Sequence, residues 1–307
     1  MIILKYYPEG TNKALAKKFE SAVQIKEAMR SGETVEGKVL LCDREHNLHI
    51  DLGTYKGIIP YREGAIGIQE GTVRDIALIS KVNKSVCFRI IGFHRLESGE
   101  KIAVLSRRAV QLECMKSFVD KLREGDIIDA KITHLESFGA FIDIGCGINS
   151  LIPIDMLSVS RISHPSQRLC EGQLIKTVLR KREENKLTFS LKELLGTWEE
   201  NAALFSVGET VGGIVRSVES YGVFIELMPN LAGLAEFSEE LKEGQSVSVY
   251  IKSIIPEKMK IKLAVVEAFD EMSPKTELEY FVKEKHISAW RYSPRGAAKT
   301  VETFFSP

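Results

Sequence analysis

The chain has 307 residues, a length that predicts two to four structural units rather than one small domain. Lys and Arg together number 42, as do Asp and Glu, so no global positive field draws the protein onto nucleic acid. The five cysteines are scattered without the spacing of a metal knuckle or redox motif, which fits a cytosolic protein. No apolar run approaches the ~18 residues of a membrane span, so we expect a cytoplasmic protein with no membrane contact.

The first predicted element is an amphipathic helix within residues 1–30. From Thr11 to Arg30, apolar residues recur at near-helical spacing among Lys and Glu, with Thr11 as the cap and Gly32 as the stop.

Three stretches of the chain open alike, each with a glycine turn that feeds an alternating strand, at Gly32, Gly125 and Gly208. Each continues through short apolar strands to a charged turn and a closing strand. Five short strands cannot hide a sheet face alone, so each stretch predicts a small closed barrel of the oligonucleotide-binding type. The predicted fold is therefore all-β, with three tandem five-stranded barrels at 31–112 (degenerate), 122–193 and 205–266.

Helices are predicted as linkers between the barrels, at Arg107 to Leu122 and at Leu191 to Phe205, because apolar residues recur there at helical spacing. After the third barrel, residues 267–307 are predicted to form a C-terminal helix and tail. Ser273-Pro274 is the helix-start signal, and one apolar face is supplied by Leu278, Phe281 and Val282.

The end of the tail carries Trp290 and Tyr292, which we expect to fold back on the last barrel. A separate binding site in this region is the alternative.

One motif of aromatic, glycine, small residue, aromatic, aliphatic and acid occurs twice, at residues 138–143 and 221–226. Side chains alternate along a plain strand, so two aromatics three positions apart would point in opposite directions. A bulge at the glycine would reset the alternation and turn both rings to one face. We predict two exposed ring pairs that stack on bases of single-stranded nucleic acid; the alternative places all four rings in the core. The pairs are Phe138 with Phe141 and Tyr221 with Phe224.

With these motifs, residues 31–266 resemble tandem copies of the S-one RNA-binding repeat, named after the largest small-subunit ribosomal protein of bacteria. The resemblance implies that the aromatic pair and a basic residue opening the last strand form the RNA face. The family's histidine at the end of the third strand is replaced by Pro153 and Glu236, which predicts weaker binding. The implied RNA-binding residues are Phe138, Phe141 and Lys186 in the second unit and Tyr221, Phe224 and Lys260 in the third.

Other basic residues of the second unit are candidates for phosphate contact. Arg180 belongs to a basic run before the closing strand, and Arg161 and Arg168 lie in a long polar loop, residues 158–169. The alternatives are a solvated turn for Arg180 and a loop that merely caps the barrel for the other two.

The first unit departs from the pattern. Aligning Asp51 with Asp143 places His46 and His49 at the aromatic positions and Asn47 at the glycine. Histidine can also stack on a base, but we favour a polar strand surface at a protein interface. The leading repeats of the ribosomal protein dock on the small subunit, so the resemblance implies such docking here, through the N-terminal helix and the first barrel.

No phosphate loop, serine elbow or His-Glu-x-x-His motif is present, so we predict no enzyme and no catalytic, cofactor-binding or metal-binding residues. The resemblance implies a monomeric bacterial protein that holds single-stranded mRNA at the small ribosomal subunit in translation. Two alternatives stay open: a protein-docking adaptor built from barrels, and an off-ribosome regulator of RNA turnover or transcription.

Overall fold

The computed structural model describes residues 6–95, 97, 99–184, 186–272 and 278–305. The chain divides into two compact units: unit 1 is Met1–Leu122 with Asp143–Asn149, and unit 2 is Arg123–Ile142 with Ser150–Pro307. The helix start predicted at Ser273-Pro274 lies outside the described residues.

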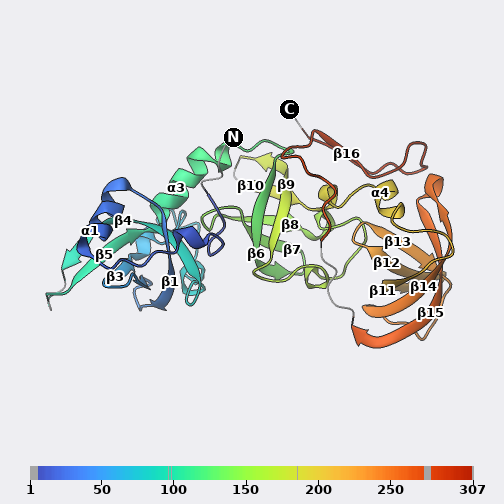
Figure 1. The fold of residues 1–307 in the computed structure, drawn as a ribbon, viewed down its shortest axis with the longest axis horizontal. Helices are drawn as coiled ribbons and strands as arrows, with labels where there is room; N and C mark the ends of the chain where they lie inside the picture. Colours follow the sequence, from blue (N-terminus) through green and yellow to red (C-terminus); the bar gives the residue numbers. More distant parts are fainter. Residues whose placement is uncertain (1–5, 96, 98, 185, 273–277, 306–307) are drawn as a thin grey trace. The chain divides into compact units, whose positions relative to one another are not determined.

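The strands form closed five-stranded barrels that share one order, in which the first strand pairs with the second and fourth and the third pairs with the fifth (Figure 1). The predicted all-β fold of five-stranded barrels is confirmed. The first barrel consists of β1 (Val35–Cys42), β2 (Leu48–Asp51), β3 (Lys56–Ile59), β4 (Ser85–Arg95) and β5 (Lys101–Ser106). The second consists of β6 (Ile127–Glu136), β7 (Gly139–Asp143), β8 (Asn149–Pro153), β9 (Leu174–Glu183) and β10 (Lys186–Ser190). The third consists of β11 (Thr210–Glu219), β12 (Gly222–Met228), β13 (Leu231–Ala235), β14 (Gln245–Ile255) and β15 (Lys260–Met272).

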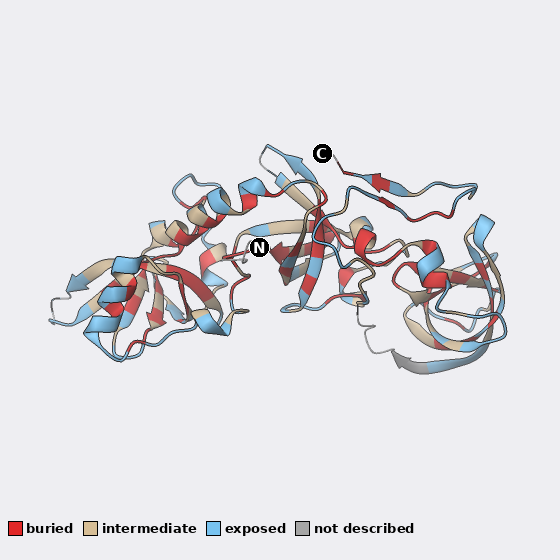
Figure 2. Ribbon diagram, turned by 45° about the horizontal axis from the view of Figure 1, so that its top comes forward, coloured by how far each residue is buried: buried red, intermediate tan, exposed pale blue. Residues whose placement is uncertain are grey.

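Each barrel fills its interior with the aliphatic side chains of alternating strand positions, so buried and exposed residues alternate along the strands (Figure 2). In β7, Ala140 and Ile142 are fully buried, while Phe141 between them is only half-buried. The same alternation places Val223 and Ile225 of β12 in the core.

The predicted N-terminal helix is shorter than expected. Helix α1 spans Ala22–Ser31, and its cap is Ser21, whose hydroxyl accepts a hydrogen bond from the Gln24 N–H. Gly32 ends the helix as predicted, in the left-handed conformation at φ 63°. Thr11 is not a cap, and between residues 6 and 21 the one helical element is the 3-10 turn Lys13–Leu15.

The residues before α1 belong to the first barrel, so the prediction of one continuous helix is wrong. The Phe19 N–H donates to the Leu52 carbonyl at 2.7 Å, and the Phe19 carbonyl accepts from the Thr54 N–H at 3.0 Å. The Phe19 ring is buried in the barrel core. Barrel contacts fix this segment as extended chain, which overrides the helical spacing of its apolar residues.

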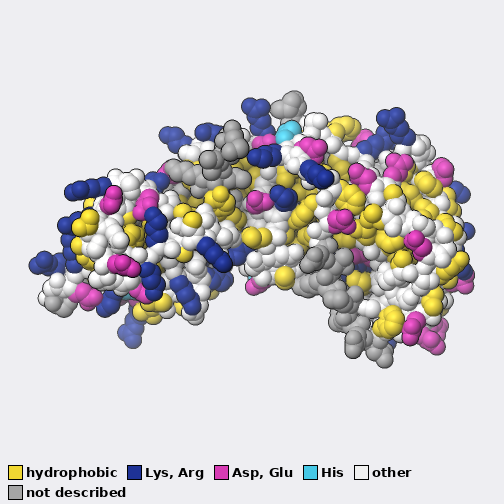
Figure 3. Space-filling view, viewed as in Figure 1, with side chains coloured by type: hydrophobic (Ala, Val, Ile, Leu, Met, Phe, Trp, Pro, Cys, Tyr) yellow, Lys and Arg dark blue, Asp and Glu magenta, His cyan; other side chains and the backbone are white. Residues whose placement is uncertain are grey.

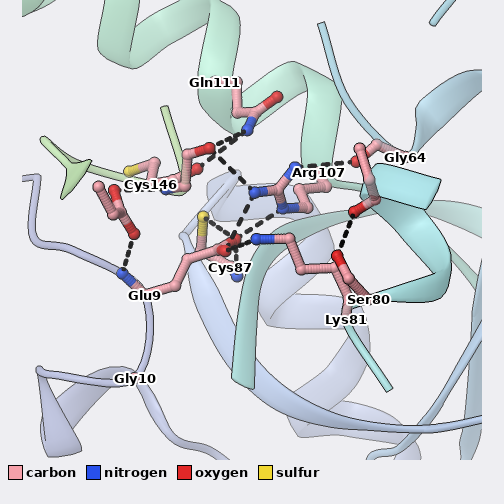
Figure 4. A network of polar contacts seen from close by, with 12 residues as sticks. Glu9, Gly10, Gly64, Ser80, Lys81, Cys87, Arg107, Gln111 and Cys146 are labelled. Carbon is pink, nitrogen blue, oxygen red and sulfur yellow. Dashed lines mark hydrogen bonds and ion pairs between the residues drawn. The ribbon is translucent and has the colours of Figure 1, made fainter. Parts of the chain in front are cut away.

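Unit 1 also holds a buried ion pair between the N-terminal segment and the helix that follows β5 (Figure 4). Arg107 Nε lies 2.6 Å from Glu9 Oε1 and Arg107 Nη2 lies 3.0 Å from Glu9 Oε2. Lys81 Nζ adds a contact of 3.3 Å, and the Cys87 N–H donates to Glu9 Oε1. The Glu9 N–H donates to Asp143 Oδ2 at 2.7 Å, so both the side chain and the backbone of Glu9 are engaged.

Helices stand at both positions where linkers are predicted. After β5 the chain forms α3 (Arg107–Ser117) and the 3-10 turn Val119–Lys121, and after β10 it forms the 3-10 turn Lys192–Leu194 and α4 (Trp198–Ala202). A capping box closes the start of α4, between the Thr197 and Glu200 side chains and backbones. The remaining short elements are α2 (Ile76–Ile79) and the 3-10 turns Tyr61–Glu63, Ile154–Met156, Pro165–Gln167 and Pro256–Lys258.

The prediction of a helix over Leu278, Phe281 and Val282 is wrong, because residues 278–283 carry no helix or strand. The Phe281 N–H donates instead to the Leu194 carbonyl, which holds this part of the tail extended. Beyond it, β16 (Ala289–Arg291) and β17 (Glu302–Phe304) form a two-stranded sheet. Trp290 and Tyr292 pack into the core of the third barrel, as the sequence predicts.

Within the part of the chain that the structure describes, no helix combines the length and apolar character needed to cross a membrane.

Candidate nucleic-acid interface

The first aromatic of each motif lies in a tight turn and not in a strand. Ser137 and Phe138 connect β6 to β7, and Ser220 and Tyr221 connect β11 to β12. The alternation of side chains along a strand therefore does not apply to Phe138 or Tyr221. Both rings of a pair can lie on one face without a bulge at the glycine that follows. The predicted glycine bulge is wrong in the third barrel, where Glu219 pairs directly with Gly222 and the register shifts between Val215 and Ser217.

Close packing explains the glycine that follows each turn. A Cβ on Gly139 would lie 2.4 Å from the Ile152 carbonyl oxygen, and one on Gly222 would lie 2.6 Å from the Ala235 oxygen. The turn before β7 is also fixed by its backbone, because the Ile154 N–H donates to the Phe138 carbonyl at 2.9 Å. The neighbouring third strand thus holds the first aromatic of the motif in place.

The structure brings the rings of each motif together on the outside of the barrel. The Phe138 and Phe141 centroids lie 5.8 Å apart with the ring planes at 87°, and those of Tyr221 and Phe224 lie 6.1 Å apart at 86°. Phe138 is 54% exposed and Tyr221 is 67% exposed, while the second ring of each pair is half-buried. Each pair therefore offers an anchored ring and a free ring edge-to-face with it, an arrangement that suits aromatic contacts.

Strand pairing places a lysine beside the aromatic pair of the third barrel. Phe224 pairs with Leu234, Leu234 with Lys262, and Lys262 with Ser253, and paired residues share one face of a sheet. The exposed Lys262 side chain therefore follows Phe224 across the barrel surface. Sequence analysis selected Lys260 instead, although counting alternate positions along this strand would have pointed equally to Lys262.

The corresponding row in the second barrel carries its lysine one strand later, on the fourth strand of the barrel. Leu151 pairs with Thr188, and Thr188 with Lys181, whose Nζ lies 2.8 Å from Glu183 Oε1. Lys181 belongs to the basic run from which sequence analysis chose Arg180.

The two lysines predicted from the resemblance are exposed at the starts of the closing strands. Lys186 opens β10 opposite Glu183, and Lys260 opens β15 opposite Ile255. Arg161 is exposed in the long loop of the second barrel, as expected of a residue that could reach phosphate.

One predicted phosphate contact, Arg168, is wrong, and the structure places a second, Arg180, beside an acid and an aromatic ring. Arg168 forms two hydrogen bonds to Glu226, at 3.2 and 2.8 Å, and its side chain is 2% exposed, so it cannot reach a phosphate. Arg180 occupies the register shift of β9 between Leu179 and Lys181, so it is not one of the residues that pair with β10. Its Nε lies 3.9 Å from Glu193 Oε1, and its guanidinium carbon lies 5.8 Å from the Phe305 ring centroid.

The acid next to the third barrel's aromatic pair is neutralised. Glu226 is buried and also accepts hydrogen bonds from Arg216, at 3.0 and 2.9 Å. Glu236, which stands where the family carries its histidine, pairs with Lys252 at 2.9 Å. The acidic residues that would lower RNA affinity in this barrel are therefore partly compensated.

Sequence analysis missed a histidine on the aromatic face of the second barrel. Because the turn between β6 and β7 has two residues, His134 stands opposite Phe141, as Ser217 stands opposite Phe224. Hydrogen bonds to Glu171, at 2.7 Å, and to Glu136, at 2.9 Å, raise the pKa of His134. The length of the turn between β6 and β7 could have revealed His134, because turn length determines which residue lies opposite Phe141 on the neighbouring strand.

The first barrel presents a different face at the same place. His49 pairs with Ile58, Ile58 with Val104, and Val104 with Gly92, so this row ends without a cation. His49 Nε2 lies 2.9 Å from Asp43 Oδ2. Burial raises the pKa of Asp43, but hydrogen bonds from His49 and Asn47 outweigh it and leave the pKa below its usual value.

His46 also faces an acid. Its Nε2 lies 3.5 Å from Asp75 Oδ2, and its ring centroid lies 6.0 Å from that of Tyr61. His46 and His49 are thus both turned toward carboxylates.

Charges of both signs are interspersed over the visible face in Figure 3, in keeping with the equal counts of acidic and basic residues. Among the described residues, no group of three or more His, Cys, Asp or Glu side chains is arranged to hold a metal ion. The candidate interface is therefore a local arrangement of rings and a few lysines.

Comparison with known proteins identifies the second barrel. The sequence profile described as the S1 RNA binding domain matches residues 121–192, which include β6 to β10. The second barrel is therefore similar to the S1 RNA binding domain over all five of its strands. Phe138, Phe141 and His134 lie within the matched residues, and the resemblance stated from the sequence is confirmed there.

Curated relatives are similar over a larger part of the chain. Small ribosomal subunit protein bS1 of Leuconostoc lactis is 27% identical over 277 residues, covering 84% of this chain and 62% of the relative. The bS1 homologs of Bacillus subtilis and Bacillus cereus are 31% and 29% identical, over 60% and 73% of this chain and over 52% and 60% of their own lengths. The chain therefore spans between about half and about three fifths of the length of these relatives.

A solved structure of a multidomain protein with nucleic acid binding domains from Streptococcus pneumoniae is 13% identical, covering 78% of this chain and 75% of that one. Its TM-score of 0.26 is too low to support any argument about the fold.

Proposed function

We propose that the chain binds single-stranded RNA through its second and third barrels and acts in translation at the small ribosomal subunit. The observation that carries the proposal is the exposed pair of perpendicular rings, which recurs in both barrels with almost the same separation and angle. Large exposed aromatic surface is unfavourable in water unless a partner covers it, and nucleobases are flat partners of the right size. The S1 domain assignment of residues 121–192 supports RNA as that partner.

The binding mechanism combines stacking with local charge. Each base stacked on Phe138 or Tyr221 contributes about 1 to 3 kcal/mol, and the half-buried second ring keeps the exposed ring from collapsing onto the barrel. Lys262 and Lys181, in line with the aromatic pairs, neutralise phosphates together with the strand-opening Lys186 and Lys260. Since stacking accepts any base, sequence preference is slight and affinity falls with salt.

The ribosomal part of the proposal is supported by the relatives, whose names place them in the small ribosomal subunit. We expect the chain to hold unpaired mRNA there as a monomeric cytoplasmic protein. The first barrel would contact small-subunit protein. Its row of paired residues contains His49 and aliphatic residues, where the rows of the other barrels contain an aromatic residue and a lysine. The segment before α1 is hydrogen-bonded to that barrel.

A second candidate function is a protein-docking adaptor in which RNA is incidental. The observation that favours it is the first barrel, where His46 and His49 are paired with acids. In this case RNA affinity would be weak and insensitive to the aromatic residues.

The deciding experiment is a fluorescence titration of an unstructured single-stranded RNA with the Phe138→Ala, Phe141→Ala double variant. Losing two stacking partners should raise the Kd by about tenfold or more. Phe237→Ala is the matched control, because Phe237 is also exposed in unit 2 but stands outside both motifs. An unchanged Kd in the double variant would refute the RNA-binding mechanism.

Sucrose-gradient sedimentation of cell extract tests the ribosomal part. We expect the wild-type protein to travel with the small subunit at low salt. Leu41→Asp places a charge opposite His49 on the first barrel and should release the protein, whereas Val23→Asp, at an exposed position of α1, should not. Co-purification of proteins without RNA or small subunits would favour the adaptor.

A further inference from the structure

We infer that the second and third barrels bind one RNA strand as a preassembled two-site interface, held by a joint centred on Glu226 and Asn230. This inference rests on the proposed function and adds to it how the two aromatic pairs cooperate. All the contacts that carry it lie within unit 2.

The first half of the joint is an ion triad. Arg168, from the long loop of the second barrel, and Arg216, from β11 of the third, both form two hydrogen bonds to Glu226. The side chains of Arg168, Arg216 and Glu226 are 2%, 6% and 2% exposed. Paired hydrogen bonds between a guanidinium and a carboxylate fix direction as well as distance, so the triad sets the orientation of the loop on the third barrel.

The second half of the joint is the buried amide of Asn230, in the turn between β12 and β13. Its Oδ1 accepts from the Val159 N–H at 2.9 Å, and its Nδ2 donates to the Lys192 and Gly196 carbonyls at 2.8 and 3.0 Å. One side chain of the third barrel thus satisfies backbone groups of the second barrel's loop and of the linker.

The C-terminal tail spans both barrels. On the second barrel, the Ile127 N–H donates to the Lys285 carbonyl and the Ile287 N–H donates to the Gly125 carbonyl, both at 2.9 Å. On the third barrel side, the Tyr292 hydroxyl donates to the Asn230 carbonyl at 2.6 Å. The tail therefore contacts the joint itself.

The joint is coupled to the proposed RNA face through β12. Phe224 and Glu226 are two residues apart on this strand and therefore project from the same face. Fixing Glu226 to Arg168 fixes the strand that carries Phe224 relative to the second barrel. A strand of RNA that reaches both aromatic pairs then meets sites already in place, and its second contact occurs at a high effective concentration without an ordering cost.

The test compares two lengths of unstructured oligouridine on three proteins. A short oligomer, about 6 nucleotides, occupies one barrel, and a long one, about 24 nucleotides, can reach two. Arg168→Met releases the second barrel's loop while Glu226 keeps its bonds to Arg216, and adding Asn230→Ala removes the amide bonds to Val159, Lys192 and Gly196. Acrylamide quenching of Trp198 and Trp290, both buried beside Tyr292, reports whether the joint has opened.

We expect the double variant to make these tryptophans quenchable, to weaken binding of the long oligomer about tenfold, and to leave the short oligomer's Kd within about twofold of wild type. Equal loss of affinity for both lengths would show that Arg168 contacts RNA directly and would overturn the inference. An opened joint with undiminished long-oligomer binding would overturn it as well, as would tryptophans that stay protected. If wild-type protein fails to bind either oligomer, the proposed function fails first.

Discussion

Replacing Glu9 by glutamine tests whether the N-terminal segment is a structural part of the first barrel. Glu9 is buried against Arg107 and Lys81. Burial alone would raise the pKa of Glu9, but the charges of Arg107 and Lys81 outweigh it and lower the pKa to about 2. Glutamine keeps the size of the side chain and removes its charge, which leaves the Arg107 guanidinium buried without a carboxylate.

The expected cost follows from that pKa. A fall from 4.5 to about 2 corresponds to about 3 kcal/mol of stability at neutral pH. Removing one partner of a buried ion pair costs about 3 to 5 kcal/mol in general, so the two figures agree. Glu33→Gln is the matched control, because Glu33 pairs with Lys17 at 2.6 Å on the surface and should cost no more than about 1 kcal/mol.

Hydrogen–deuterium exchange of β4 is the assay, because the Cys87 N–H in this strand donates to Glu9. Protection there should fall by about 100-fold in Glu9→Gln, since each 1.4 kcal/mol changes an equilibrium tenfold. Trp198 and Trp290 both lie in unit 2, so tryptophan fluorescence in urea should keep its midpoint.

The pH dependence has a defined sign. The folded pKa of Glu9 is below its unfolded value, so its contribution is complete above pH 4.5 and disappears as the pH falls toward 2. The stability gap between wild type and Glu9→Gln should close across that window. The reasoning would be refuted if the β4 amides of Glu9→Gln were as protected from exchange at pH 7 as those of wild type. A stability difference between the two proteins that stays constant down to pH 2 would also refute it.

Two further predictions concern the RNA face. Lys262→Ala should weaken binding to all RNA sequences alike and reduce the slope of log Kd against log salt concentration by about 0.7. The control Lys258→Ala, in the turn before β15, should change neither the affinity nor the slope. RNA titrations at several salt concentrations test both variants. Because its pKa is raised, His134 should keep its charge above pH 6.5 and lose it at higher pH, leaving Glu136 and Glu171 uncompensated beside Phe141. RNA affinity should therefore fall by about twofold more between pH 6.5 and 8.5 in wild type than in His134→Gln, and identical pH profiles would contradict this assignment.

Local signals in the sequence were sufficient for the barrels and for the aromatic pairs. The repeated glycine-led strands predicted the strand content, and the repeated motif found Phe138, Phe141, Tyr221 and Phe224, although a tight turn and not a bulge brings the rings together.

Contacts between residues distant in the chain could not be predicted. Arg168 and Glu226 are 58 positions apart, and no residue near Arg168 in the sequence indicates that it pairs with a buried carboxylate. An arginine in a polar loop was therefore interpreted as a phosphate contact. The segment around Phe19 has helical spacing, yet hydrogen bonds to Leu52 and Thr54 hold it extended. The lysine rows depend on the pairing of the third strand with the fifth, which only the closed barrel reveals.

The acid that ends the repeated motif has a role different from that of the rings. Asp143 accepts a hydrogen bond from the Glu9 N–H, and Glu226 accepts hydrogen bonds from the Arg168 guanidinium, so each acid binds a residue from earlier in the chain. Asp51, at the same place in the first barrel, contacts Lys18 of the N-terminal segment at 3.1 Å. The motif therefore combines a ring pair at the barrel surface with a carboxylate that binds a residue from earlier in the chain. The first barrel has the acid, Asp51, with histidines at the ring positions, so the carboxylate contact does not depend on the ring pair.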